Sequence, residues 1–150
     1  MESNTRQTWK ETKMRDIKFR VWAEITTKEW MQDQHNFKRE YRMLKVHSIH
    51  CNTNNVIVSS DFGAHSLPLS EVNLMQYTGL KDLKRQEIYE CDILKQYPGF
   101  GCTWKHRVGI VKYYGASFWI HFGAQSFVLD DHDCKFEVIG NIYENRELLK

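Results

Sequence analysis

The chain of 150 residues lacks any long hydrophobic run. A membrane-spanning helix needs roughly 18 or more apolar residues, whereas the longest apolar runs here, such as Val56-Ile57-Val58, have the length of a strand. The polar N-terminus, MESNTRQTWKETK, has no apolar segment of the kind that a secretory signal requires. We therefore expect a protein without a membrane association, located in the cytoplasm.

Cysteine pairs and an excess of one charge are also missing. The four cysteines, at positions 51, 91, 102 and 134, form no CxxC pair, so we expect reduced thiols with a structural role. The formal net charge is only +2. This balance neither requires nor excludes nucleic acid, because a dedicated DNA-binding domain usually has a stronger basic excess.

The composition that is present favours a folded protein. Hydrophobic residues make up 41% of the chain and aromatic residues 13%, which is enough for one ordinary domain or two small ones. Residues 1–13 have no periodic apolar face, so we predict a flexible tail there. Order is expected to begin at Met14.

Alternation of apolar and polar residues predicts strands in the N-terminal part. In residues 17–22, Ile17, Phe19 and Val21 alternate with Lys18, Arg20 and Trp22, which is the period of a strand. The polar residues 24–29 predict a turn into a second short strand around Trp30 and Met31, followed by a loop or short exposed element over 32–42. Residues 52–55, Asn-Thr-Asn-Asn, indicate a hairpin turn, since asparagine tolerates left-handed backbone angles.

A boundary is predicted after Pro68, between an N-terminal β-rich part, 14–68, and a C-terminal part, 69–150. Proline biases Leu67 toward an extended conformation and argues against a helix. Two β-rich runs follow around Gly115-Ala116, with Phe118 on one face of the second run and Trp119 on the other. Further strands are predicted near 126–131 and 135–140, and a helical turn near the C-terminus. Short, closely spaced strands favour a small barrel.

Four segments together resemble the YopX family of phage and prophage proteins. They are MRDIKFRVW (14–22), LMQYTGLKD (74–82), EIYECDIL (87–94) and EVIGNIYENRELL (137–149). The resemblance implies a mostly-β fold in which an SH3-like small barrel is preceded by a small N-terminal β element. It also implies a bacteriophage accessory protein whose molecular role is not established, and a fold does not fix a function.

The chain departs from the family pattern at two turns. Lys84-Arg85 stand where the family usually has asparagine and glycine, and Cys91 stands where it has glycine. Because a side chain is costly at a positive φ angle, we predict that the turn has changed type and that Arg85 lies on an exposed loop. Asp92 is expected to accept backbone N–H bonds while remaining in solvent.

Catalytic and metal-binding patterns are weak. Acidic residues cluster at 87–92 and at 130–133, but no second motif completes an active site. His47, His50 and Cys51, and the His-Cys pair at 132 and 134, match no zinc spacing. The glycines at 99 and 101 form no phosphate-binding motif. We expect a non-enzymatic protein with no cofactor and no metal.

Binding is the favoured function. The chain has 5 Trp, 7 Tyr and 8 Phe, and a small barrel cannot bury all of these rings, so some are expected to anchor an interface. The favoured partner is a host protein, which a phage product would inhibit during host takeover or as an anti-defence factor. The alternative is a nucleic-acid-binding module of a phage early gene, because basic and aromatic residues interleave in 37–45 and 103–109. Self-association is also possible. The candidate binding residues are Arg85, Lys105, Arg107, Tyr113, Tyr114 and Trp119.

Overall fold

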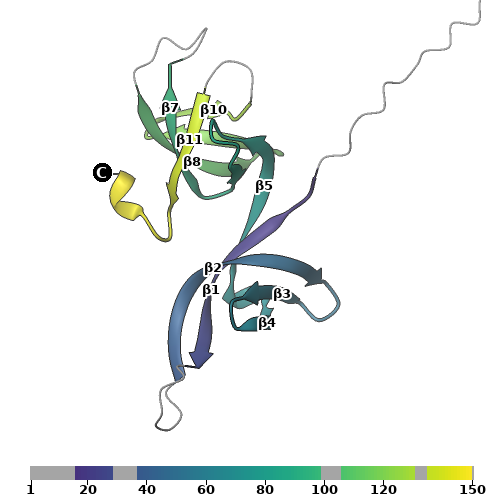
Figure 1. The fold of residues 1–150 in the computed structure, drawn as a ribbon. Helices are drawn as coiled ribbons and strands as arrows, with labels where there is room; N and C mark the ends of the chain where they lie inside the picture. The colour runs from purple at the N-terminus through teal and green to yellow at the C-terminus, as the bar shows by residue number, and fades with distance from the viewer. Residues whose placement is uncertain (1–15, 29–36, 99–105, 131–134, 150) are drawn as a thin grey trace, which may run out of the picture.

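The computed structural model describes residues 16–28, 37–98, 106–130 and 135–149, which form two antiparallel sheets (Figure 1). The strands are β1 Phe19–Lys28, β2 Phe37–His50, β3 Asn55–Ser60, β4 Gly63–Pro68, β5 Asn73–Lys81, β6 Glu87–Tyr89, β7 Asp92–Tyr97, β8 Arg107–Tyr114, β9 Ser117–Phe122, β10 Gln125–Val128 and β11 Lys135–Asn141. Two short 3-10 helices, η1 Leu69–Glu71 and η2 Arg146–Leu149, complete the described elements. The prediction for residues 1–13 lies outside the described residues.

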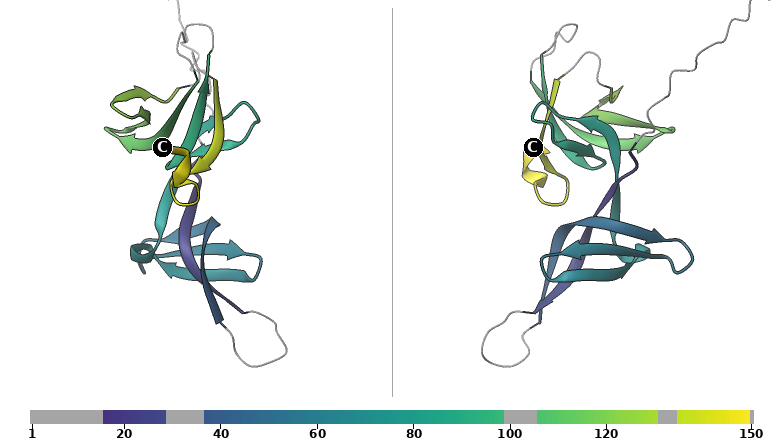
Figure 2. Two further views of the ribbon diagram at one scale, coloured as in Figure 1. Left: turned by 90° about the vertical axis from the view of Figure 1, so that its left-hand side faces the viewer. Right: turned by 45° about the vertical axis from the view of Figure 1, so that its right-hand side comes forward.

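The two sheets form two lobes, and two strands run from one lobe into the other. The strand order is β4-β3-β2-β1-β5-β6 in one sheet and β10-β9-β8-β7-β11 in the other. Figures 1 and 2 show β1 and β5 running between the lobes, so the six-stranded sheet reaches from the lower lobe into the upper one. In the described part of the chain, no helix has the length and apolar character that would let it cross a bilayer.

Each lobe has its own hydrophobic core. In the N-terminal lobe, alternate residues of β1 point to one side because successive strand side chains face opposite ways. That core consists of Val21, Ala23, Ile25, Leu44, Val56 and Val58. The C-terminal core consists of Ile88, Leu94, Val111, Phe118, Ile120, Leu129 and Phe136. Ile88 comes from β6, so the six-stranded sheet contributes to the second core and ties the lobes together.

The mostly-β prediction is confirmed, whereas the SH3-like barrel is not. The five-stranded sheet has distinct end strands, β10 and β11, with no pairing between them among the described residues. The β5–β6 loop covers the outer side of β11, since the Leu83 N–H donates to the Phe136 carbonyl at 2.9 Å and the Val138 N–H to the Asp82 carboxylate at 3.0 Å. The domain division at residue 69 stays a prediction.

The predicted turn at 24–29 is wrong, and so is the loop over the second half of 32–42. β1 continues to Lys28 and pairs with β2, where Lys28 lies opposite Phe37. The β2–β3 register extends only over Lys45–His50, so the earlier part of β2 pairs with β1 alone. One face of this ribbon is buried through Ala23, Ile25 and Leu44, and Tyr41 on the other face is exposed, so a largely polar sequence can form a strand there. Trp30 and Met31 lie outside the described residues.

The predicted change of turn type before β6 is also wrong. Arg85 has φ 68° and Cys91 has φ 67°, so the backbone at both residues adopts the left-handed conformation that favours glycine. Hydrogen bonds explain this result, because they fix the backbone at both positions. The Asp82 carboxylate accepts the N–H groups of Lys84 and Gln86 at 2.8 Å each, and the Cys91 N–H donates to the Val111 carbonyl at 2.9 Å.

Candidate functional site

The β8–β9 hairpin presents aromatic rings to solvent. Tyr114 is 75% exposed and Tyr113 is 50% exposed. The ring of Tyr113 packs edge-on against the buried Phe118, with centroids 5.1 Å apart. The Trp119 indole N–H donates to the Tyr114 carbonyl at 3.0 Å and so fixes the end of the hairpin. The exposed Tyr113 ring is therefore held in place by Phe118, and the exposed Tyr114 ring projects from a fixed backbone.

The face of the five-stranded sheet that carries Trp119 reaches the edge strand β10. Val128 of β10 lies opposite Trp119, and Trp119 lies opposite Lys112 of β8, so these residues share one face. Val128 is exposed, and all four residues of β10 are exposed. We call Tyr113, Tyr114, Trp119 and Val128 the hairpin surface. Three of these four residues, Tyr113, Tyr114 and Trp119, were predicted as binding residues. Tyr114 and Trp119 share one face of the hairpin, whereas Tyr113 lies opposite the buried Phe118 on the other face.

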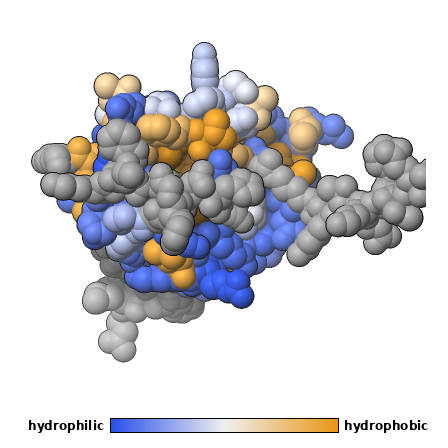
Figure 3. Space-filling view, turned by 90° about the horizontal axis from the view of Figure 1, so that it is seen from above, coloured by the Kyte–Doolittle hydropathy of each residue, from blue (hydrophilic) through white to orange (hydrophobic). Residues whose placement is uncertain are grey.

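The view onto the upper lobe shows how apolar surface is distributed there. Several orange patches are separated by blue, hydrophilic surface on this face (Figure 3). Scattered apolar groups among polar ones are ordinary on a folded protein, so this distribution by itself does not mark an interface.

Arg107 is a predicted binding residue that is already engaged within the protein. Its guanidinium donates to the Gln96 side chain at 3.0 and 3.1 Å and to the Gln125 side chain at 2.9 Å. It also lies over the rings of Phe122 and Phe127, 4.2 and 5.2 Å from their centroids. Arg107 therefore fastens β10 to β7 and β8, at the opposite end of β8 from Tyr114. Lys105 lies outside the described residues.

Arg85 lies apart from the hairpin surface, on the β5–β6 loop. It lines a pocket of about 400 Å³ together with Lys81, Lys135 and Asp130. Three basic side chains thus meet at this pocket, while the carboxylate of Asp82 in its wall is engaged by backbone N–H groups.

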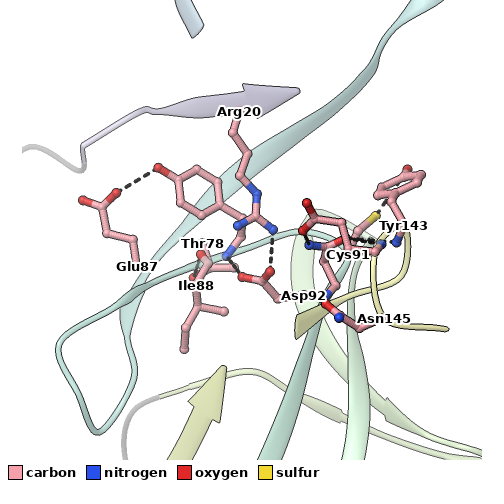
Figure 4. Close-up of polar contacts among 11 residues, drawn as sticks. Arg20, Thr78, Glu87, Ile88, Cys91, Asp92, Tyr143 and Asn145 are labelled. Carbon is pink, nitrogen blue, oxygen red and sulfur yellow. Dashed lines mark hydrogen bonds and ion pairs between the residues drawn. The ribbon is translucent and has the colours of Figure 1, made fainter. Parts of the chain in front are cut away.

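An ion pair that the sequence did not indicate joins the two lobes (Figure 4). Arg20 of β1 pairs with Asp92 at the start of β7. Asp92 is only 1% exposed, so the expectation that it stays in solvent is wrong. Its other oxygen accepts the Tyr89 N–H at 2.8 Å, which confirms the predicted turn-fixing role. Burial raises the pKa of the Asp92 carboxyl group, and the Arg20 charge opposes that shift.

Further polar contacts surround this pair. The Arg20 guanidinium lies 4.6 Å from the centroid of the Tyr89 ring, and the Tyr89 hydroxyl donates to Glu87 at 2.8 Å. Glu87 also pairs with Lys18. The hydrogen bond from Lys18 is the main reason that the pKa of Glu87 is lowered, and burial raises the pKa of Tyr89. We call Lys18, Arg20, Glu87, Tyr89 and Asp92 the junction cluster.

Aromatic stacking continues from the junction along the N-terminal lobe. Tyr143 stacks on Trp22 with centroids 5.9 Å apart, and Trp22 stacks on Tyr41 at 6.0 Å. The Tyr143 hydroxyl lies 3.9 Å from the Cys91 thiol. Burial raises the pKa of Tyr143 to about 12 and also raises the pKa of the Cys91 thiol. A thiol with a raised pKa is a poor nucleophile, which agrees with a structural role for Cys91.

The residues weighed as metal ligands are dispersed where the structure describes them. Among those residues, no three His, Cys, Asp or Glu side chains converge. His50 hydrogen-bonds to Ser48 at 2.9 Å, and Cys51 is exposed. Residues 131–134 of the second candidate cluster lie outside the described residues. The absence of a metal stays a prediction.

The fold and these contacts define a class: a two-lobed, antiparallel β protein whose lobes are tied at a polar junction and whose upper lobe carries exposed rings. The chain belongs to the YopX family, since residues 18–150 match the family described as YopX protein, and the resemblance seen in the sequence is confirmed. It is also similar to the crystal structure of protein EF1440 from Enterococcus faecalis, at 25% identity and a TM-score of 0.53, over 90% of this chain and 99% of that chain. No curated protein matches the chain.

Proposed function

We propose that the chain is a non-enzymatic phage accessory protein that acts in the bacterial cytoplasm by binding a host protein through the hairpin surface. The observation that carries this proposal is the exposure of Tyr113 and Tyr114 on a hairpin whose backbone is fixed by Trp119. A ring that is already held in place, as that of Tyr113 is by Phe118, loses little conformational freedom on binding, which favours it as an interface anchor. Membership of a phage-associated family supports a host factor, and inhibition of that factor, as the biological outcome.

The test is affinity capture of proteins from nuclease-treated host lysate with the wild type, Tyr114→Ala and Tyr41→Ala. Tyr41 is the matched control, because its ring is 58% exposed but belongs to the other lobe. We expect one defined protein to be retained by the wild type and Tyr41→Ala and lost with Tyr114→Ala, at unchanged melting temperature. Equal capture by all three proteins, or no specific protein at all, would contradict the proposal.

Nucleic-acid binding is the second candidate, supported by the three basic side chains at the pocket of Arg85. In that case the retained material would be removed by nuclease, and affinity for a labelled oligonucleotide would fall steeply with salt concentration. Arg85→Gln would reduce that affinity, whereas Tyr114→Ala would change it little unless the ring stacks on a base.

A further inference from the structure

The strands β1 and β2 separate at the junction and leave part of β2 without a neighbour. Their pairing ends where Arg20 lies opposite Lys45. From there β2 continues through Val46–His50 with β3 on one side only, whereas the chain before Arg20 turns to β5, where the Lys18 carbonyl accepts the Tyr77 N–H at 2.9 Å. Among the described residues, nothing pairs with the other edge of Val46–His50. That edge offers backbone donors and acceptors to an incoming strand.

A groove of about 800 Å³ lies between the separated strands, a volume within the usual range of roughly 300–1,000 Å³ for ligand sites. One wall is residues 17–20, the other is residues 43–49, and Glu87 and Tyr89 lie at its end. The groove contains apolar side chains that the two cores leave partly in solvent. Ile17 is 70% exposed, and Phe19 is half-buried.

The charges around the groove are unbalanced. Of the basic residues that line it, Lys18 is paired with Glu87 and Arg20 with Asp92, which leaves Lys45 without a carboxylate partner among the described residues. Lys45 and His47 are exposed on the β2 wall, and no acid lies within ion-pair distance of either in the described part of the chain. A β-bulge between Val46 and Ser48 leaves both His47 and Ser48 exposed there. An occupant with acidic side chains would complement this rim.

We propose that the groove binds a short extended segment of a partner protein, with alternating aliphatic and acidic side chains, added as a strand along Val46–His50. Five residues of strand span about 17 Å at roughly 3.3 Å per residue. Backbone hydrogen bonds to the free edge hold the segment, its aliphatic side chains cover Ile17 and Phe19, and its acidic side chains face Lys45 and His47. This mode of recognition takes affinity from the backbone and specificity from alternate side chains. The site goes beyond the proposed function, because it is separate from the hairpin surface.

The test begins with a library of random displayed heptapeptides, from which those that bind the full chain are selected. The enriched sequences are then measured as labelled synthetic peptides by fluorescence polarisation. We expect enrichment of acidic and aliphatic residues, and at least a tenfold weaker Kd with Lys45→Glu and with Ile17→Asp. Both side chains are exposed, so the fold should survive, and melting temperatures verify this. N-methylation of alternate peptide nitrogens should abolish binding, and amide shifts in NMR spectra should concentrate at Val46–His50.

Tyr114→Ala is the matched control, since a loss of the hairpin surface leaves this groove intact. Its unchanged peptide affinity would separate the groove from the proposed function, so either can fail alone. The proposal is overturned if no peptide is enriched, if enriched peptides are basic, or if Lys45→Glu and Ile17→Asp bind them normally. It is also overturned if Ile17→Asp abolishes a dimer of the chain, or if single-stranded DNA produces the same amide shifts.

Discussion

Removal of the Arg20 charge should destabilise the whole protein through the carboxylate that it leaves behind. Asp92 is 1% exposed, and the side chain of Arg20 is 16% exposed. Arg20→Met keeps an apolar stem against the Tyr89 ring but leaves Asp92 with only the Tyr89 N–H bond. Breaking one side of a buried ion pair costs about 3–5 kcal/mol. Because Arg20 keeps some contact with water, we expect the lower end of that range.

A loss of about 3 kcal/mol should lower the melting temperature by roughly 6–12 °C for a chain of this size. Urea unfolding is the suitable assay, since guanidinium chloride would screen the ion pair. The double variant Arg20→Met/Asp92→Asn should recover most of the loss, because the amide oxygen can still accept the Tyr89 N–H and no charge remains buried. Lys84→Met is the matched control, because it removes the exposed pair with Glu137 and should change stability little.

The stability lost in Arg20→Met should also depend on pH. In Arg20→Met, burial acts on Asp92 without an opposing cation, so the pKa of its carboxyl group rises further above the unfolded value of about 3.9. The penalty is complete above the folded pKa and disappears as the pH falls below the unfolded pKa. The difference between wild type and Arg20→Met should therefore shrink between pH 8 and pH 4. A loss under about 1 kcal/mol, or a difference that stays constant with pH, would refute the reasoning.

Three further predictions concern local features. Arg85→Gly should raise the free energy of unfolding, measured with urea. The relief of about 1–2 kcal/mol of left-handed strain exceeds the cost of roughly 0.5–1 kcal/mol from the added chain entropy of glycine. Arg85→Ala keeps a Cβ at φ 68° and should give no gain. Tyr143→Phe should reduce the stability lost between about pH 10 and pH 12, since the pKa of Tyr143 is raised to about 12 and unfolded tyrosine ionises first; an unchanged alkaline loss would contradict this. Trp119→Phe should cost about 1 kcal/mol through the lost bond to the Tyr114 carbonyl, and no change in thermal unfolding would show that the bond does not fix the hairpin.

Local patterns in the sequence were sufficient for many of the strands. The alternation in Ser117–Phe122 predicts that Phe118 and Ile120 share a face, and both are buried. In residues 17–22 the same alternation predicts a strand, but of the apolar face only Val21 is buried. The asparagines at 52–55 predict the β2–β3 turn, where Asn54 has φ 54°. The number of aromatic residues predicts that some rings stay outside the core, and Tyr113 and Tyr114 are among the exposed ones. These inferences need only neighbouring residues.

Features that depend on distant partners could not be found in this way. Arg20 and Asp92 are 72 positions apart, and neither residue differs locally from an ordinary solvated charge. The left-handed angle of Arg85 is imposed by hydrogen bonds of Asp82 to the turn and to β11, so side-chain preference alone gave the wrong answer. The polar start of β2 forms a strand because β1 pairs with it, although its own composition favours a loop.

The junction cluster connects the two proposed surfaces physically. The hairpin surface belongs to the C-terminal lobe, while Lys18, Arg20, Glu87 and Tyr89 of the junction cluster line the groove. Two sites on one partner bind together with a high effective concentration when their spacing matches the distance between the two surfaces. The Arg20–Asp92 pair joins β1 to β7 and, together with Ile88 of β6 in the C-terminal core, contributes to that distance. A partner that uses both surfaces should consequently lose affinity with Arg20→Met by more than an isolated peptide or an isolated hairpin ligand does, although neither surface has lost its anchoring side chains.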